Sequence, residues 1–203
     1  MGLKNILAAA SVVLLLCSFS SQAIASNNTT SLDISSNNEA LKDFIPRSVI
    51  AFWSSPNTGR KILNIAVANY YDMKFESFFG MPTMPPEGKS YFLIQLMGEK
   101  PGKKESSTFM PGTYTFALDN NNDGVILNHI IVMTSHSKPL SSGSITSMVV
   151  TQRTTLAGEK SVQTKELKGS IELLEISESH AKGKLVYAEP GATLNLDFDV
   201  EIE

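Results

Sequence analysis

FMPGTYTFALDNNNDGVILNHIIVMT, residues 109–134, is the stretch that says most about the fold. Residues 113–116 and 125–132 are rich in β-branched and aromatic side chains, which favour strands. Between them, residues 119–124 are only Asp, Asn and Gly, which bond to their own backbone and tolerate positive φ. The pattern predicts a β-hairpin whose turn is formed by residues 119–124.

The tip of this predicted hairpin also has the spacing of half a calcium-binding loop. Asp119, Asn121 and Asp123 alternate and Gly124 follows them, as in an EF-type loop whose oxygens converge on the ion. Such a loop has a glutamate at its twelfth position, where this chain has Ile130. Two interpretations follow: a weak calcium site at these three residues, or a polar turn that holds no metal.

Strand-like patterns continue through most of the chain from residue 47 onward. Seven further candidate strands are residues 48–53, 61–70, 89–97, 144–153, 162–176 with a break near 168–169, 183–188 and 193–202. The last of them alternates most clearly, because Leu194, Leu196 and Phe198 are separated by polar residues. About nine short strands in one domain over residues 39–203 predict an antiparallel β-sandwich or a closed β-barrel.

Residues 1–25 have the pattern of a signal peptide. Lys4 gives a positive start, residues 6–17 are apolar, and Ala23-Ile24-Ala25 is a small-x-small cleavage site. The pattern predicts a mature protein that starts at Ser26 and is secreted or periplasmic. Cys17 would also suit a lipid anchor, although the residue before it is Leu rather than the small residue of lipoprotein signals. No later apolar run reaches the ~20 residues that a membrane-spanning helix needs.

The segment after the cleavage site is polar. Residues 26–38 are mostly Ser, Asn and Thr, and this composition predicts a flexible leader. Asn38 is a good helix-capping residue, and the helix-forming residues after it predict one short helix from Glu39 to Phe44 that Pro46 ends.

The charge and cysteine content exclude several classes of function. The first 25 residues contain one Lys, no acid and the single Cys, so 16 basic and 20 acidic residues remain, a net charge of −4. Without a thiol, the mature chain has no disulfide, thiolate metal site or cysteine nucleophile. No basic block stands out, which disfavours binding to nucleic acid.

The segment from Tyr70 to Gly88 is rich in aromatic residues, methionine and proline. If exposed, it would be a contact surface for a protein, a glycan or a lipid. If buried, it would plug an open end of the fold, and the density of apolar side chains favours this interpretation. The candidate ligand-binding residues are Tyr70, Tyr71, Phe75, Phe78, Phe79, Met81 and Met84.

Metal and catalytic motifs are otherwise weak. Methionines near Met81 and three separated histidines do not form the close ligand set that copper needs. No known catalytic motif occurs, and the acids at 197, 199, 201 and 203 fit a solvated strand face better than an acid–base pair.

Short segments of the last third resemble the closing strands of uncharacterised secreted or lipoprotein β-sandwich domains of Bacteroidetes. These segments are residues 169–172, 180–185 and 198–200, and residues 111–116 add to the likeness. The resemblance implies a fold and no activity. The sequence thus predicts an exported, non-catalytic β-sandwich protein with a binding or structural role. The alternatives are a calcium-assisted carbohydrate-binding or adhesion module and a hydrolase without a recognisable motif.

Overall fold

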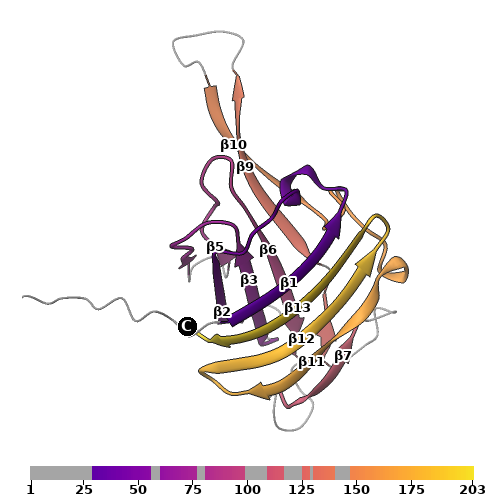
Figure 1. The fold of residues 1–203 in the computed structure, drawn as a ribbon. Coiled ribbons are helices and arrows are strands. Elements are labelled where there is room, and N and C mark those ends of the chain that lie inside the picture. Colours follow the sequence, from indigo (N-terminus) through magenta and orange to yellow (C-terminus); the bar gives the residue numbers. More distant parts are fainter. Residues whose placement is uncertain are drawn as a thin grey trace, which may run out of the picture.

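Two antiparallel β-sheets stack face to face in the computed structural model (Figure 1). The structure describes residues 29–55, 60–76, 81–98, 109–116, 125–128, 130–139 and 147–203. The sheets form a sandwich and do not close into a barrel, which confirms the all-β prediction and decides between its two alternatives. The described residues contain no α-helix.

The order of the strands in each sheet departs from their order in the chain. The five-stranded sheet runs β1 (Thr29–Ser36), β13 (Ala192–Glu201), β12 (His180–Glu189), β11 (Lys168–Ile176) and β7 (Gly112–Thr115). The six-stranded sheet runs β10 (Ser147–Thr154), β9 (Ile131–Pro139), β6 (Ser90–Met97), β3 (Ile62–Ala68) and β2 (Ser48–Ser54), and β8 (Ile126–Leu127) also pairs with β6. A separate pair is formed by β4 (Phe75–Glu76) and β5 (Met81–Pro82).

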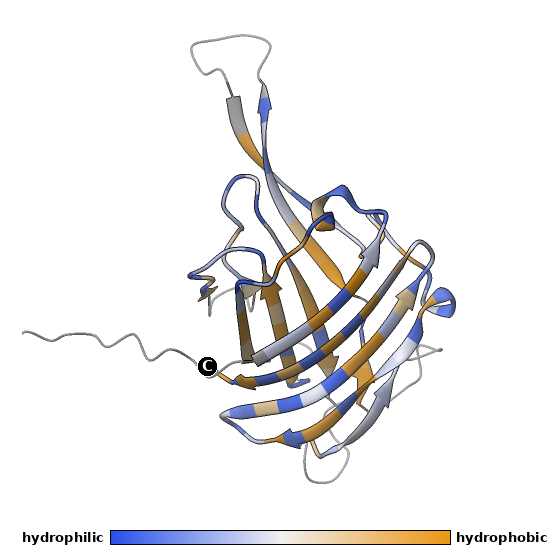
Figure 2. Cartoon of the chain, viewed as in Figure 1, coloured by the Kyte–Doolittle hydropathy of each residue, from blue (hydrophilic) through white to orange (hydrophobic). Residues whose placement is uncertain are grey.

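The main core lies between the two sheets and follows the alternation of the strands. In β13, Leu194, Leu196 and Phe198 are buried while the residues between them face solvent, as predicted. Figure 2 shows the same alternation of apolar and polar residues along β12 and β13. Burying one such large apolar side chain stabilises the fold by about 1.5–3 kcal/mol.

The six-stranded sheet, in contrast, is buried on both of its faces. Every residue of β3 is buried. In β2, Val49 and Ala51 belong to the main core, whereas Ile50 and Phe52 belong to a second apolar cluster on the outer face. Near-continuous apolar strands are typical of a sheet covered on both sides.

The predicted hairpin over residues 109–134 is wrong. β7 pairs with β11 in one sheet, whereas β8 pairs with β6 in the other, and within the described residues the two runs are joined by an isolated parallel bridge between Phe116 and Leu127. The two runs pair with different sheets, although their side chains share the main core: the Phe116 ring packs 5.5 Å from the Tyr187 ring, and Leu127 is buried in the same core. Strand propensity is local, and the partner of a strand is decided by distant residues.

The predicted flexible leader is also corrected, because residues 29–36 form an edge strand. β1 pairs along its whole length with β13, from Thr29 opposite Asp199 to Ser36 opposite Ala192. The leader has few apolar residues, but Leu32 and Ile34 pack against the main core. The backbone hydrogen bonds of a sheet edge order a segment that its composition alone would leave flexible.

The predicted helix over Glu39 to Phe44 is shorter than expected and is a single 3₁₀ turn, η1 (Glu39–Leu41). Asn38 caps it as predicted, since its Oδ1 accepts a hydrogen bond from the Ala40 N–H at 3.0 Å. Asp43 has a left-handed backbone with φ of 56°, which no residue of a right-handed helix adopts. A second 3₁₀ turn, η2 (Thr164–Glu166), precedes β11.

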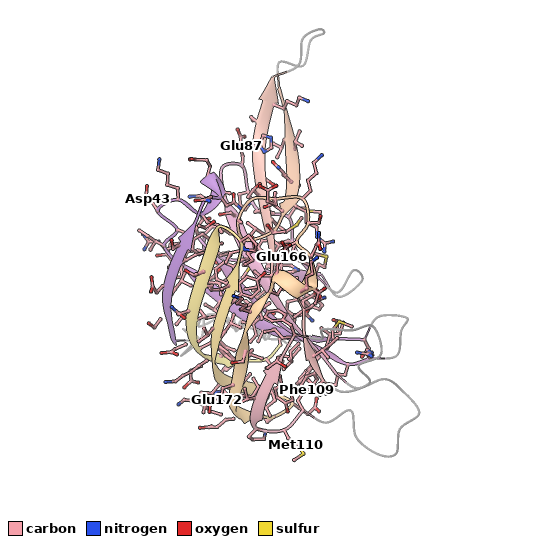
Figure 3. The ribbon with its side chains drawn as sticks, turned by 90° about the vertical axis from the view of Figure 1, so that its right-hand side faces the viewer. Asp43, Glu87, Phe109, Met110, Glu166 and Glu172 are labelled. Carbon is pink, nitrogen blue, oxygen red and sulfur yellow. The ribbon has the colours of Figure 1, made fainter. Side chains whose placement is uncertain are left out.

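Strands β9 and β10 extend beyond the rest of the sandwich as a two-stranded arm (Figures 1 and 3). β9 pairs with β6 only over residues 131–134, while it continues to pair with β10 up to Pro139. Figure 3 shows Glu87 beside the lower part of the arm.

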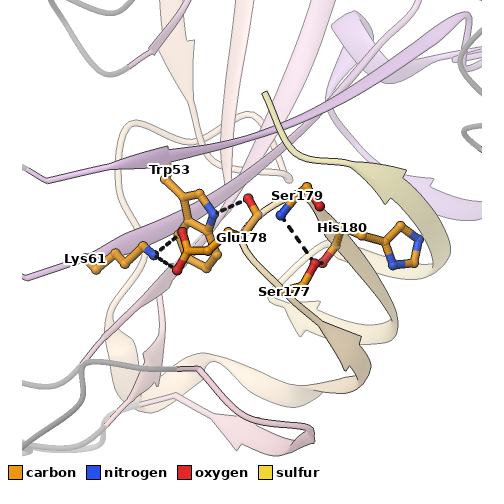
Figure 4. Close-up of polar contacts among 6 residues, drawn as sticks. All are labelled: Trp53, Lys61, Ser177, Glu178, Ser179 and His180. Atoms are coloured by element: carbon orange, nitrogen blue, oxygen red, sulfur yellow. Dashed lines mark hydrogen bonds and ion pairs between the residues drawn. The ribbon is translucent and has the colours of Figure 1, made fainter.

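A polar contact joins the two sheets at the turn between β11 and β12. The Trp53 indole N–H donates to the Glu178 backbone carbonyl at 3.0 Å, and Lys61 forms an ion pair of 2.7 Å with the Glu178 carboxylate (Figure 4). The Lys61 ammonium also lies 4.0 Å from the centre of the Trp53 ring, a cation–π contact.

Candidate functional site

A cavity of about 470 Å³ lies at the base of the arm, at an open end of the sandwich. Residues from β6, β9 and β10 form one wall, and the η1 turn and Gly158 contribute to the rest. Pockets for small molecules commonly have volumes of about 300–1,000 Å³, so this cavity has a suitable size.

The wall of the cavity is a row of polar side chains across three strands. Ser90 of β6 faces Thr134 of β9, which in turn faces Gln152 of β10. Residues that face each other in antiparallel strands project from the same side of the sheet. These three side chains therefore lie side by side and line the cavity.

The same side of the sheet is apolar one row deeper. There Phe92 faces Val132, and both are fully buried in the main core. Since alternate residues of a strand share a face, Ser90 and Thr134 continue the core-facing side of their strands. The inner face of the sheet thus changes from apolar to polar where the cavity begins.

The opposite wall is held by Asn38. Its amide Nδ2 donates to Thr154 Oγ1 at 3.2 Å and to the Thr155 carbonyl at 3.3 Å, while its Oδ1 caps η1. Ser90 Oγ donates to the carbonyl of Ala40 at 3.0 Å and so ties the turn to β6. These bonds fix the shape of the cavity before any ligand binds.

The groups that the cavity offers are hydroxyls and amides, with one charge of each sign. Thr134 is half-buried, while Gln152 and His136 are exposed at the rim. Lys89 and Glu39 also line the rim, and their charges oppose each other. Among the described residues, no group of three or more His, Cys, Asp or Glu side chains could hold a metal ion.

The predicted binding segment lies elsewhere, on the outer face of the six-stranded sheet. Tyr70 is 7% exposed, and Phe75 and Met81 are half-buried against the second apolar cluster. Tyr71 and Met84 are each 65% exposed. The favoured interpretation, that this segment plugs an open end of the fold, is wrong. The described parts of the segment cover a sheet face instead, because the outer faces of β2, β3 and β6 are apolar and need to be covered.

Several predicted features fall outside the described residues. Asp119, Asn121 and Asp123 are among them, so the calcium site stays a prediction. The same holds for Phe78, Phe79, the signal peptide and Cys17.

The cavity residues were missed by sequence reasoning because three separate strands supply them. One signal could have found them: Thr134 and His136 continue the core-facing alternation that Ile130 and Val132 begin. Polar residues at strand positions that face the core indicate a place where the space between the sheets is open to solvent.

The solvent face of the five-stranded sheet carries a polar cluster around Asp199. Asp199 Oδ1 lies 2.7 Å from His180 Nε2, and its Oδ2 lies 3.0 Å from Lys182 Nζ. The hydrogen bonds from His180, and then from Lys182, hold the pKa of the Asp199 carboxyl below its ordinary value of 3.8.

Replacing His180 with alanine should raise the pKa of Asp199 toward 3.8, because the largest cause of its depression is removed. A depressed carboxyl pKa stabilises the fold above the ordinary pKa, and this stabilisation is lost as the pH falls through the depressed value. The variant should therefore have a lower free energy of unfolding than the parent protein above pH 3.8. The two free energies should converge in stronger acid. Carboxyl NMR titration measures the shift, with His136→Ala on the arm as the control. An Asp199 pKa that is equal in both variants would contradict the assignment.

Comparison with known proteins adds no relative: no protein-family model, no curated protein and no solved structure matches this chain. Within the part of the chain that the structure describes, no helix has the length and apolar character needed to cross a bilayer.

Proposed function

We propose that this chain is an exported, non-catalytic binding protein that holds a small, uncharged, polyhydroxylated ligand such as a sugar in the cavity at the base of the arm. The polar row of Ser90, Thr134 and Gln152 is the observation that carries the proposal. Export rests on the signal-peptide pattern of residues 1–25.

The chemistry of the lining supports an uncharged ligand. Hydroxyl and amide groups both donate and accept hydrogen bonds, which suits a ligand that carries several hydroxyls. The opposite charges of Lys89 and Glu39 at the rim favour neither an anion nor a cation. The bonds of Asn38 support a preformed site, and a preformed site loses less conformational entropy on binding.

The proposal is tested by titrating the protein with a panel of neutral mono- and disaccharides in calorimetry and thermal-shift measurements. At least one sugar should bind and raise the melting temperature, because a ligand that binds only the folded state stabilises it by about 2.7 kcal/mol at a hundredfold excess over its Kd. Thr134→Val and Gln152→Ala should each weaken binding by about 2- to 12-fold, the worth of one hydrogen bond.

Ser137→Ala is the matched control, because Ser137 is an exposed residue of the arm and does not line the cavity. It should leave both sugar affinity and melting temperature unchanged. If no sugar of the panel binds, or if Gln152→Ala binds as tightly as the parent protein, the proposed site is wrong.

A further inference from the structure

The outer face of the six-stranded sheet is covered by the segment that connects β3 to β6. We name its described parts, residues 70–76 and 81–88, the cover. The Phe75 ring stacks on the ring of Phe52 with centroids 3.9 Å apart, and Met73 is 6% exposed. Beneath the cover, the sheet presents Ile50, Leu93 and Ile131.

Hydrogen bonds tie the cover to the six-stranded sheet at its two ends. Ser48 Oγ donates to the Tyr70 carbonyl at 2.8 Å, and the Gly88 N–H donates to the Ser135 carbonyl at 2.8 Å. Asp72 and Gly88, near those ends, both have left-handed backbones, with φ of 59° and 70°. Between the ends, β4 and β5 pair with each other. The described parts of the cover thus pair with each other and rest on the sheet through apolar contacts.

Two buried hydroxyls, one in the cover and one on the sheet beneath it, have no hydrogen-bond partner among the described residues. They belong to Tyr70, which is 7% exposed, and Tyr91, which is fully buried. Burial raises the pKa of Tyr70 to about 12. It also raises the pKa of Tyr91, with a smaller contribution from neighbouring Tyr70, so both phenols are neutral donors. Most buried polar side-chain atoms in proteins have a partner, and an unpaired one calls for an explanation.

A guanidinium lies along the same row of the sheet. Tyr91 faces Met133, and Met133 faces Arg153 on the edge strand β10, so the three side chains project from the outer face. Arg153 is exposed. With strands about 4.8 Å apart, roughly 10 Å separates the backbones of Tyr91 and Arg153. The row thus leads from buried phenols to a positive charge.

We propose that the outer face beneath the cover is a binding site for a long acyl chain with a carboxylate head, which enters when the cover swings away on its two ends. The apolar side chains of the sheet and cover would contact the acyl chain. The Tyr70 and Tyr91 hydroxyls donate to the carboxylate, and Arg153 pairs with its charge. Ala66 and Ala68, which are both fully buried, belong to the same apolar face. This apolar face lies on the opposite side of the six-stranded sheet from Ser90 and Thr134, although Gly88 at the end of the cover also lines the cavity at the base of the arm.

The experiment follows the fluorescence of cis-parinaric acid, an 18-carbon polyene carboxylate, as the folded protein binds it, and then displaces it with oleate or with methyl oleate. Oleate should displace the probe at least tenfold more effectively than its ester, because only oleate carries the carboxylate. Tyr70→Phe, Tyr91→Phe and Arg153→Gln should each weaken oleate binding by about 5- to 10-fold and leave the ester unchanged. The two Phe variants keep the buried ring.

Tyr114→Phe is the matched control, because its hydroxyl donates to the Met110 carbonyl at 2.6 Å and β7 belongs to the other sheet. It should bind oleate as the parent protein does. Failure of the probe to bind, equal displacement by oleate and its ester, or unchanged oleate affinity in the three variants would each overturn the proposal. Better displacement by a phosphate-headed lysolipid than by oleate would overturn the choice of head group. Thr134→Val should not alter oleate binding, which separates this test from that of the sugar site.

Discussion

Replacing Gly169 with alanine should lower the free energy of unfolding by about 2–6 kcal/mol. Gly169 has φ of +121°, a conformation that L-residues rarely adopt, and forcing alanine into it costs about 1–3 kcal/mol. A Cβ at this position would lie 1.9 Å from the Val186 carbonyl oxygen, and relieving such overpacking costs about 1–3 kcal/mol more. Because domains are stable by only about 5–15 kcal/mol, this single methyl group threatens the fold. Urea unfolding followed by circular dichroism measures the change.

Gly88→Ala is the matched control for this substitution. Gly88 also has a positive φ, of +70°, but a Cβ there meets nothing within 4 Å. The control should therefore lose only the conformational part, about 1–2 kcal/mol. Equal losses in the two variants would mean that the contact with Val186 is not the cause.

Replacing Phe52 with alanine should lower the free energy of unfolding by about 3–5 kcal/mol, the usual cost of removing a buried Phe side chain. Phe52 is fully buried between the sheet and the cover, and its main aromatic contact is Phe75. The loss includes both the transfer of the ring and the cavity that it leaves. Thermal and urea unfolding give the difference in stability.

Two substitutions in the cover serve as comparisons for the loss of stability in Phe52→Ala. Phe75→Ala should cost less than Phe52→Ala, because Phe75 is only half-buried. Met84→Ala should stay within about 0.5 kcal/mol, since Met84 is 65% exposed. A loss below about 1 kcal/mol for Phe52→Ala would show that the cover does not rest on this face.

The sequence predicts this fold well where the pattern is local. The alternation of β13 could be read from Leu194, Leu196 and Phe198 alone, because a period of two needs only neighbours along the chain. The cap of η1 by Asn38 was equally local. The existence and approximate bounds of β2, β3, β6 and β10 follow from the same kind of signal.

The features that could not be predicted depend on distant partners. Residues 109–134 have strand propensity and a turn between the strands, yet β7 and β8 join different sheets. The cavity arises only when Ser90, Thr134 and Gln152 become neighbours across three strands. The sequence predicts the cover as an apolar segment but not its place, because that place depends on the apolar outer face of the six-stranded sheet.

The pairing of β1 with β13 has a consequence for the time course of folding. Thr29 meets Asp199, 170 residues later, so β1 has no partner until β13 has been synthesised. Closing so large a loop costs entropy before the new contacts repay it, and folds dominated by such non-local pairings form in milliseconds to seconds rather than microseconds. The strands of the six-stranded sheet all lie between residues 48 and 154, so this sheet can pair its strands before β13 has been synthesised. We therefore expect this sheet to form first and to serve as the template on which the five-stranded sheet assembles, with β1 joining it last.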